Sequence, residues 1–169
     1  MPKLTESEFA AFLATPGILM RVGVVRPDGR PLVTPIWFIH EEDAIWFTPR
    51  DKSEWFACLR RDPRVSLCID EQPHPYRKVI VDGEAELVHD VGEDDVWRER
   101  YRRIAQRYVP PDAADAYIQN TIEEPRGLYR VKLSDAGVTS WRMPVEGEAP
   151  EGIWASRYYV AGTQTRFEQ

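Results

Sequence analysis

The residues from Phe47 to Ser53 combine features suited to binding an anion. The pattern predicts that a strand ends near Thr48 and that a helix begins just after it. A helix N-terminus presents unpaired backbone N–H groups and the positive end of the helix dipole, and both favour a phosphate. Thr48 and Ser53 add hydroxyl donors, and Arg50 and Lys52 add positive charge. This junction is therefore a candidate phosphate site.

An ordinary helix cap is the alternative interpretation of the same junction. Asp51 stands where its carboxylate can accept hydrogen bonds from the first N–H groups of the helix, with Glu54 completing a capping box. A carboxylate in that place competes with a phosphate, and Arg50 and Lys52 then lie in solvent. Composition alone leaves both interpretations open.

Two other segments carry groups that could contact a ligand. Arg77 and Lys78 open a predicted strand, whose alternation sends them to opposite faces; the alternative is an exposed sheet edge kept soluble by charge. In the segment Thr34 to Phe38, Pro35 cannot donate to a strand ladder and so indicates an edge or a split in the sheet. A planar ligand could lie on such backbone with Trp37 as a wall, although Trp37 could equally be a core residue.

Several classes of function find no support in the sequence. The three histidines, His40, His74 and His89, lack the spacing of metal ligands, so we predict no metal site. The formal net charge of −6 argues against nucleic acid as a partner. The sequence contains neither a glycine-rich dinucleotide fingerprint nor a phosphate-binding loop of the nucleotide hydrolases.

The elements that must position these residues follow from hydrophobic periodicity and turn signals. Thr5 and Glu8 form a capping box ahead of a first helix. Short strands joined by turns predict an antiparallel sheet that curls or closes, flanked by helices. We therefore expect a mainly β, α+β domain covering residues 1–169, with no linker. The expected strands are about 19–25, 32–39, 44–48, 64–70, 77–88, 128–133 and 137–142, and the first three are expected to form a meander. The expected helices are about 5–15, 51–61, 92–108 and 112–122.

The cellular location of the protein is predicted from the absence of targeting signals in the sequence. The first residues carry no apolar segment of the kind that begins a secretory signal, and no apolar run approaches the ~20 residues needed to cross a bilayer. We expect a cytoplasmic protein with no membrane partner.

Four segments together resemble the pyridoxamine 5′-phosphate oxidase-like family of flavin-binding split barrels. No single motif is diagnostic, but their order and spacing are fairly specific over residues 9–88. The segments are Asp28-Gly29-Arg30-Pro31 leading to Thr34-Pro35-Ile36-Trp37-Phe38, then Ile45-Trp46-Phe47-Thr48, then Leu59-Arg60-Arg61-Asp62-Pro63-Arg64-Val65-Ser66-Leu67, and finally Tyr76-Arg77-Lys78-Val79-Ile80-Val81-Asp82-Gly83-Glu84-Ala85.

The resemblance implies a six-stranded antiparallel split β-barrel that forms a homodimer, with two FMN sites at the subunit interface. Thr48 and a cation between Arg50 and Lys52 hold the FMN phosphate in this reading, and main chain from Pro35 to Phe38 flanks the flavin ring. The tail lies at the dimer interface and supplies Trp154 and Arg157 over the ring of the other subunit. The full set of implied cofactor residues is Pro35, Ile36, Trp37, Phe38, Phe47, Thr48, Arg50, Lys52, Ser53, Lys78, Trp154 and Arg157.

The function implied by the resemblance is an FMN-dependent oxidoreductase that acts on a small organic substrate. The alternative is a non-catalytic protein that binds flavin, deazaflavin or haem, and a plain barrel with no cofactor is a third reading. Trp55 departs from the family pattern, because many relatives carry a lysine there. Phosphate binding must then shift to Arg50, Lys52 or Ser53, or be weaker. The basic residues with which the true oxidase binds pyridoxine phosphate are not evident, so vitamin B6 oxidation is not expected.

Overall fold

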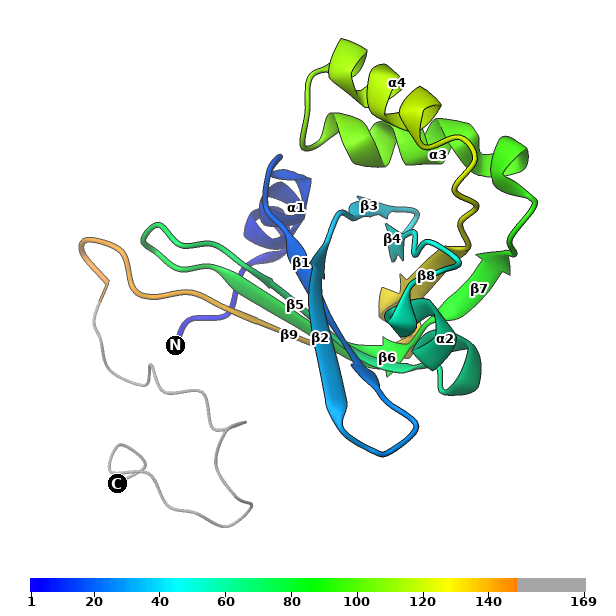
Figure 1. Ribbon diagram of the computed structural model, residues 1–169. Helices are drawn as coiled ribbons and strands as arrows, with labels where there is room; N and C mark the ends of the chain where they lie inside the picture. The colour runs from blue at the N-terminus through cyan, green and yellow to red at the C-terminus, as the bar shows by residue number, and fades with distance from the viewer. Residues whose placement is uncertain (149–169) are drawn as a thin grey trace.

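The structure is a computed structural model that describes residues 1–148, in which two antiparallel sheets are flanked by helices (Figure 1). The predicted mainly β, α+β class is confirmed, although these residues form nine strands rather than the six that the family resemblance implies. The strands are β1 (Met20–Val25), β2 (Pro31–Ile36), β3 (Ile39–Glu41), β4 (Ala44–Phe47), β5 (Arg64–Asp70), β6 (Lys78–Glu84), β7 (Glu86–His89), β8 (Leu128–Lys132) and β9 (Gly137–Trp141). The helices are α1 (Glu6–Ala14), α2 (Glu54–Arg61), α3 (Asp94–Gln106) and α4 (Pro111–Asn120), with a 3-10 turn η1 (Leu133–Asp135).

The larger sheet has the strand order β2-β1-β5-β6-β9. Its strands alternate because one face is buried: in β5, Val65, Leu67 and Ile69 are buried, while Arg64 and Ser66 are exposed. β2 lies at one edge, and Val33 on it is 63% exposed. The end of this edge strand belongs to the segment from Thr34 to Phe38, where the sequence predicts that a planar ligand could lie.

The smaller sheet has the order β3-β4-β8-β7, and β4 is buried at all of its positions. The chain passes between the sheets where β2 ends at Ile36 and β3 begins at Ile39, and again at Ala85 between β6 and β7. The expected strands 32–39 and 77–88 are therefore each split in two. The antiparallel pairing of the predicted meander is confirmed, because β1 pairs with β2 and β3 pairs with β4, but its middle strand is divided between the two sheets, so the three strands do not form one sheet.

The helices begin and end where local signals act. Thr5 accepts a hydrogen bond from the Glu8 N–H at 3.2 Å, and the Glu8 carboxylate accepts one from the Thr5 N–H at 2.8 Å, so the predicted capping box is confirmed. The fourth helix begins at Pro111 rather than after Asp112, because proline fits the first helical position without losing a needed donor.

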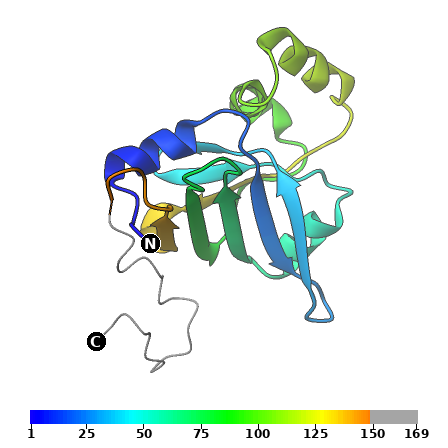
Figure 2. The ribbon, with the colours of Figure 1, turned by 90° about the vertical axis from the view of Figure 1, so that its left-hand side faces the viewer.

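A second hydrophobic cluster lies between the smaller sheet and the pair α3–α4. Trp97, Tyr101 and Ile104 of α3 pack there with Ile118 of α4 and Trp46 of β4. Figures 1 and 2 show the two helices together at one end of the molecule. Burial of these apolar side chains, which lie on one face of α3, therefore holds the helix pair against the smaller sheet.

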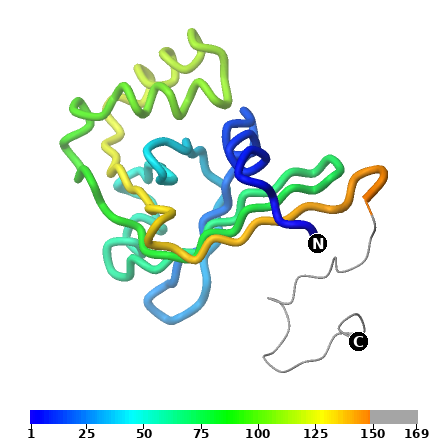
Figure 3. Tube along the Cα trace, turned by 180° about the vertical axis from the view of Figure 1, so that it is seen from behind, coloured from blue at the N-terminus to red at the C-terminus, as the bar shows by residue number. Residues whose placement is uncertain are grey.

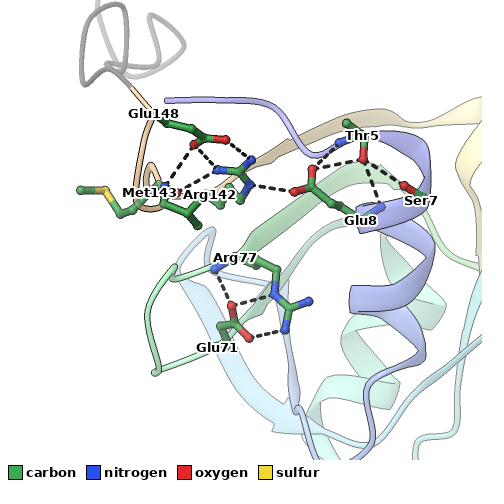
Figure 4. Close-up of polar contacts among 9 residues, drawn as sticks. Thr5, Ser7, Glu8, Glu71, Arg77, Arg142, Met143 and Glu148 are labelled. Atoms are coloured by element: carbon green, nitrogen blue, oxygen red, sulfur yellow. Dashed lines mark hydrogen bonds and ion pairs between the residues drawn. The ribbon is translucent and has the colours of Figure 1, made fainter.

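The N-terminal segment lies beside the segment that follows β9, as Figure 3 shows. The Arg142 N–H donates to the Pro2 carbonyl at 3.1 Å. The Arg142 side chain donates to Glu8 at 2.9 Å and to both carboxylate oxygens of Glu148 at 2.7 and 2.8 Å (Figure 4). Figure 4 also shows the Arg77–Glu71 pair nearby. One guanidinium thus ties α1 to the segment that follows β9.

The Arg142–Glu148 pair predicts a pH-dependent contribution to stability. Hydrogen bonds from Arg142, then one from the Val145 N–H, lower the Glu148 pKa from the usual 4.5 to about 2. Because the folded pKa is depressed, this stabilisation is present above pH 4.5 and lost as the pH falls toward 2. We expect Glu148→Gln to lower the melting temperature at pH 7, and the difference from the unaltered protein to shrink toward pH 2. Glu146→Gln, an exposed neighbour, is the control. A difference that stays constant across this range contradicts the assignment.

Candidate functional site

A cleft of about 300 Å³ opens where three parts of the fold meet. These parts are the end of β2, the junction between β4 and α2, and the helix pair α3–α4 with the segment that follows it. The residues that line the cleft are Thr34, Pro35, Ile36, Trp37, Thr48, Arg50, Ser53, Trp55, Tyr101, Ile104, Tyr117 and Arg126. The two segments that the sequence singled out, 34–37 and 48–53, thus meet in space.

Short backbone pairing brings the segment after α4 to the β4–α2 junction. Arg50 and Arg126 form an isolated antiparallel bridge, the Asp51 N–H donates to the Pro125 carbonyl at 3.0 Å, and the Gly127 N–H donates to the Pro49 carbonyl at 3.1 Å. A Cβ on Gly127 would lie 2.7 Å from the buried Phe56 ring, so glycine permits this close approach. The pairing fixes Arg126 beside the start of α2.

The N-terminus of α2 is not capped in the way the sequence suggested. Ser53, rather than Asp51, is the N-cap residue, and its hydroxyl donates to the Arg50 carbonyl at 2.6 Å instead of accepting from the helix. Asp51 lies in an exposed turn ahead of the helix, so the predicted Asp51 cap is wrong. The first turn of α2 therefore has no side-chain cap within residues 1–148, and Ser53 and Trp55, which stand at this positive end of the helix, line the cleft.

Thr48 supplies a polar group with no partner of its own. Its Oγ1 is buried and makes no hydrogen bond within the part of the chain that the structure describes. A buried hydroxyl without a partner costs free energy, commonly about 1–3 kcal/mol, unless a ligand or water satisfies it. Thr48 is thus prepared to bind an acceptor in the cleft.

Arg50 is held in the cleft by two side chains, whereas Lys52 lies at the rim. Arg50 Nη2 donates to the Tyr117 hydroxyl at 3.0 Å, and its Nη1 lies 2.8 Å from Glu124 Oε2. Lys52 Nζ donates to the other oxygen of Glu124 at 2.8 Å, and its side chain is 69% exposed. The hydrogen bond from Lys52, then the charge of Arg50, lower the Glu124 pKa, so this carboxylate is ionised at neutral pH.

Aromatic rings form another part of the cleft lining, next to Arg50. The Trp37 ring stacks on Tyr108 with centroids 5.1 Å apart and an interplanar angle of 3°, and its centroid lies 5.3 Å from that of Tyr117. The Tyr108 hydroxyl donates to the Ile18 carbonyl at 2.9 Å and accepts from the Phe38 N–H at 3.1 Å. These bonds fix the crossing from β2 to β3, so Trp37 has a supported position.

The environment of two tyrosines shifts their pKa values in opposite directions. Burial raises the pKa of Tyr101, so its phenol stays protonated. Burial also acts to raise the pKa of Tyr117, but the neighbouring Tyr101 hydroxyl and the charges of Arg126 and Arg50 outweigh it, and the net pKa is lowered. The sequence assigned neither tyrosine to a site, and it did not indicate Arg126. Tyr101 recurs at helical spacing with Trp97 and Ile104, a pattern that predicts a core residue.

The structure brings about half of the predicted cofactor residues together. Those that line the cleft are Pro35, Ile36, Trp37, Thr48, Arg50 and Ser53. Phe38 and Phe47 are fully buried, and Phe47 packs against the cleft residue Trp55 with centroids 6.0 Å apart. Lys78 begins β6 in the larger sheet and does not line the cleft, and Trp154 and Arg157 lie outside the described residues.

A larger hollow, of about 520 Å³, lies at the bend between β6 and β7. Three of the residues that line it are acidic, namely Glu84, Glu86 and Asp135, against a single Lys132. Glu86 already accepts two hydrogen bonds from Arg130, at 2.8 and 2.9 Å. An anion is disfavoured there, and we therefore place the candidate site in the smaller cleft.

The two antiparallel sheets, with a cleft where one edge strand leaves the larger sheet, define a split-barrel protein. Residues 5–137 match the family model described as pyridoxamine 5′-phosphate oxidase, and the chain belongs to this family. The resemblance seen in the sequence is thereby confirmed. No curated protein matches the chain. No helix within residues 1–148 is long and apolar enough to cross a membrane.

Solved structures show the same fold at low sequence identity. A conserved hypothetical protein from Mycobacterium tuberculosis is 24% identical, with a TM-score of 0.64 over 86% of this chain and 92% of its own. A structure named F420 reductase is 24% identical, with a TM-score of 0.56 over 81% and 98%. A heme storage protein from Vibrio cholerae is 17% identical, with a TM-score of 0.62 over 82% and 96%.

Proposed function

We propose that this protein is an FMN-dependent oxidoreductase that acts on a small organic substrate. The observation that carries the proposal is the cleft beside α2, in which an uncapped helix N-terminus, an unpartnered Thr48 hydroxyl and the guanidinium of Arg50 lie together. The lining within residues 1–148 contains two arginines and no carboxylate. These are the donors that a phosphate monoester requires.

The aromatic side of the cleft suits the flat ring of a flavin. Trp37 presents a stacked, half-buried ring, and Pro35 places backbone without an N–H at the edge strand. When bound, FMN supplies the hydride chemistry. The chain then has to orient the ring, hold the phosphate and exclude water, and no acid–base pair is required for those tasks.

A second subunit is part of the proposal. A volume of about 300 Å³ is at the lower end of small-molecule sites, and β2 beside it is a sheet edge with the exposed Val33. A homodimer that covers this edge would enlarge and close the cleft, and we propose that Trp154 and Arg157 reach it from the partner. Light scattering should give about 39 kDa, twice the 19.6 kDa chain.

The absorbance spectrum of the purified protein, followed by titration of cofactor-free protein with FMN, tests the proposal. We expect a flavin spectrum, saturable binding of one FMN per chain, and reoxidation of the reduced protein by a small organic acceptor. Saturable binding without turnover of any acceptor would indicate a carrier rather than an enzyme. A Soret band, or binding of deazaflavin in place of FMN, would assign the cleft to another cofactor and contradict the FMN proposal.

A further inference from the structure

Arg126 is buried, and no residue of the range 1–148 forms an ion pair with it. It is 6% exposed, and it is the sole charged residue among residues 1–148 that is buried to this degree. No carboxylate of the described chain forms an ion pair with it, and its Nε is buried without a hydrogen bond. A buried charge of this kind is costly unless a counter-charge is supplied.

The contacts that Arg126 does make leave most of its donors unused. Its Nη2 donates to the Tyr117 hydroxyl at a long 3.4 Å, and its guanidinium lies 4.7 Å from the centroid of the Tyr101 ring. Glu124 is close enough to interact with it electrostatically, but that carboxylate bridges Arg50 and Lys52. Asp94 accepts from the Arg126 backbone N–H at 3.0 Å rather than from its side chain.

Two phenols beside Arg126 also have protons to donate. The Tyr101 hydroxyl is buried, with Tyr101 5% exposed, and makes no hydrogen bond of ordinary geometry within the described residues. It lies near enough to the Tyr117 hydroxyl to lower the pKa of that phenol. The Tyr117 oxygen accepts from Arg50 at 3.0 Å and from Arg126 at 3.4 Å. Because a phenol oxygen has two lone pairs, its own proton remains for a third group. All three side chains line the cleft.

We propose that Arg126, Tyr101 and Tyr117 form a second oxyanion subsite at the α3–α4 end of the cleft. It would take a second carboxylate or phosphate group of the bound ligand. This subsite adjoins the one at the N-terminus of α2, because Arg50 and Arg126 donate to the same Tyr117 hydroxyl, at 3.0 and 3.4 Å. The planar guanidinium offers paired N–H donors that match such a group, and the phenols add neutral donors. The proposal deepens the proposed function and rests on it only for the source of the acidic group, which is either the substrate or the cofactor.

The substitution Arg126→Met tests the subsite, because methionine fills similar space without charge. The control is Arg102→Gln, which removes an arginine of α3 that pairs with Glu99 and Asp115 away from the cleft. Inorganic phosphate is the probe, titrated by calorimetry into cofactor-free protein at constant ionic strength. We expect two phosphates per chain in the unaltered protein and in the control. In Arg126→Met one of them should bind roughly 10- to 100-fold more weakly.

A readout without ligand separates this role from a structural one. Removing an unpaired buried charge should leave the melting temperature of cofactor-free Arg126→Met at or above that of the unaltered protein. A merely structural arginine predicts a clear fall instead. That fall, or phosphate binding unchanged by Arg126→Met, would overturn the proposal.

Titration with FMN distinguishes the two sources of the acidic group. If Arg126→Met leaves FMN affinity unchanged and the FMN-loaded protein still binds one phosphate, the subsite belongs to the substrate. If FMN affinity falls instead, the subsite belongs to the cofactor. Should the unaltered protein bind no FMN, the proposed function fails, while a phosphate site that depends on Arg126 still supports the subsite.

Discussion

Replacing Trp97 by alanine should lower the free energy of unfolding by about 3–5 kcal/mol, the range for truncating a large buried aromatic side chain. Trp97 is 5% exposed and belongs to the cluster that joins α3 to the smaller sheet. Its ring lies 6.0 Å from that of Tyr101. The melting temperature should fall by roughly 10 °C or more, measured by calorimetry.

Two further variants serve as controls for the loss of stability in Trp97→Ala. Trp97→Phe keeps an aromatic ring and removes a buried Nε1 that has no hydrogen-bond partner in residues 1–148, so it should cost much less. Val96→Ala changes the neighbouring position on the same helix, which is 73% exposed, and should be close to neutral. Near-normal stability of Trp97→Ala would show that the apolar contact of α3 with the sheet is not what holds the helix.

Replacing Arg50 by alanine should weaken FMN binding roughly 10- to 100-fold while the fold survives. One charge-assisted hydrogen bond to a phosphate contributes on the order of 1.5–3 kcal/mol, which corresponds to that change in affinity. Arg50 lines the cleft and is fixed by Tyr117 and Glu124, so its guanidinium is pre-positioned. Calorimetric titration of cofactor-free protein measures the effect.

Lys52→Ala is the matched control for Arg50, because both cations contact the same Glu124 carboxylate. Lys52 does not line the cleft and is 69% exposed, so its removal should change FMN affinity by less than a few fold. Arg50→Lys should recover only part of the affinity, since an ammonium lacks the planar fork. Equal losses for Arg50→Ala and Lys52→Ala would mean that the net charge of the rim, rather than a fixed contact, drives binding.

Local signals in the sequence were sufficient for most elements. The capping box of Thr5 and Glu8 and the alternation of Val65, Leu67 and Ile69 each depend on residues that are neighbours along the chain, and both predictions are confirmed. The meeting of the segments 34–37 and 48–53 was also indicated, because the family resemblance orders them around one ligand.

Long-range contacts decided the parts that could not be predicted. Arg126 reaches the site through backbone pairing with Arg50, a contact 76 positions away that no local pattern encodes. Tyr101 follows the helical spacing of Trp97 and Ile104, which predicts a core residue. It does belong to the buried cluster, but it also lines the cleft. The Asp51 cap failed because the Ser53 hydroxyl binds the Arg50 carbonyl and the helix begins after Ser53. The split of strands 32–39 and 77–88 reflects the passage of the chain between two sheets.

A comparison of FMN with riboflavin tests the central claim most directly, because the two differ only in the phosphate. Cofactor-free protein should bind FMN far more tightly than riboflavin, by roughly the 10- to 100-fold that a fixed phosphate contact supplies. Arg50→Ala should reduce the affinity for FMN and leave that for riboflavin nearly unchanged, since the ring contacts remain. Equal affinity of the unaltered protein for FMN and riboflavin would contradict the account, because the cleft beside α2 would then hold no phosphate.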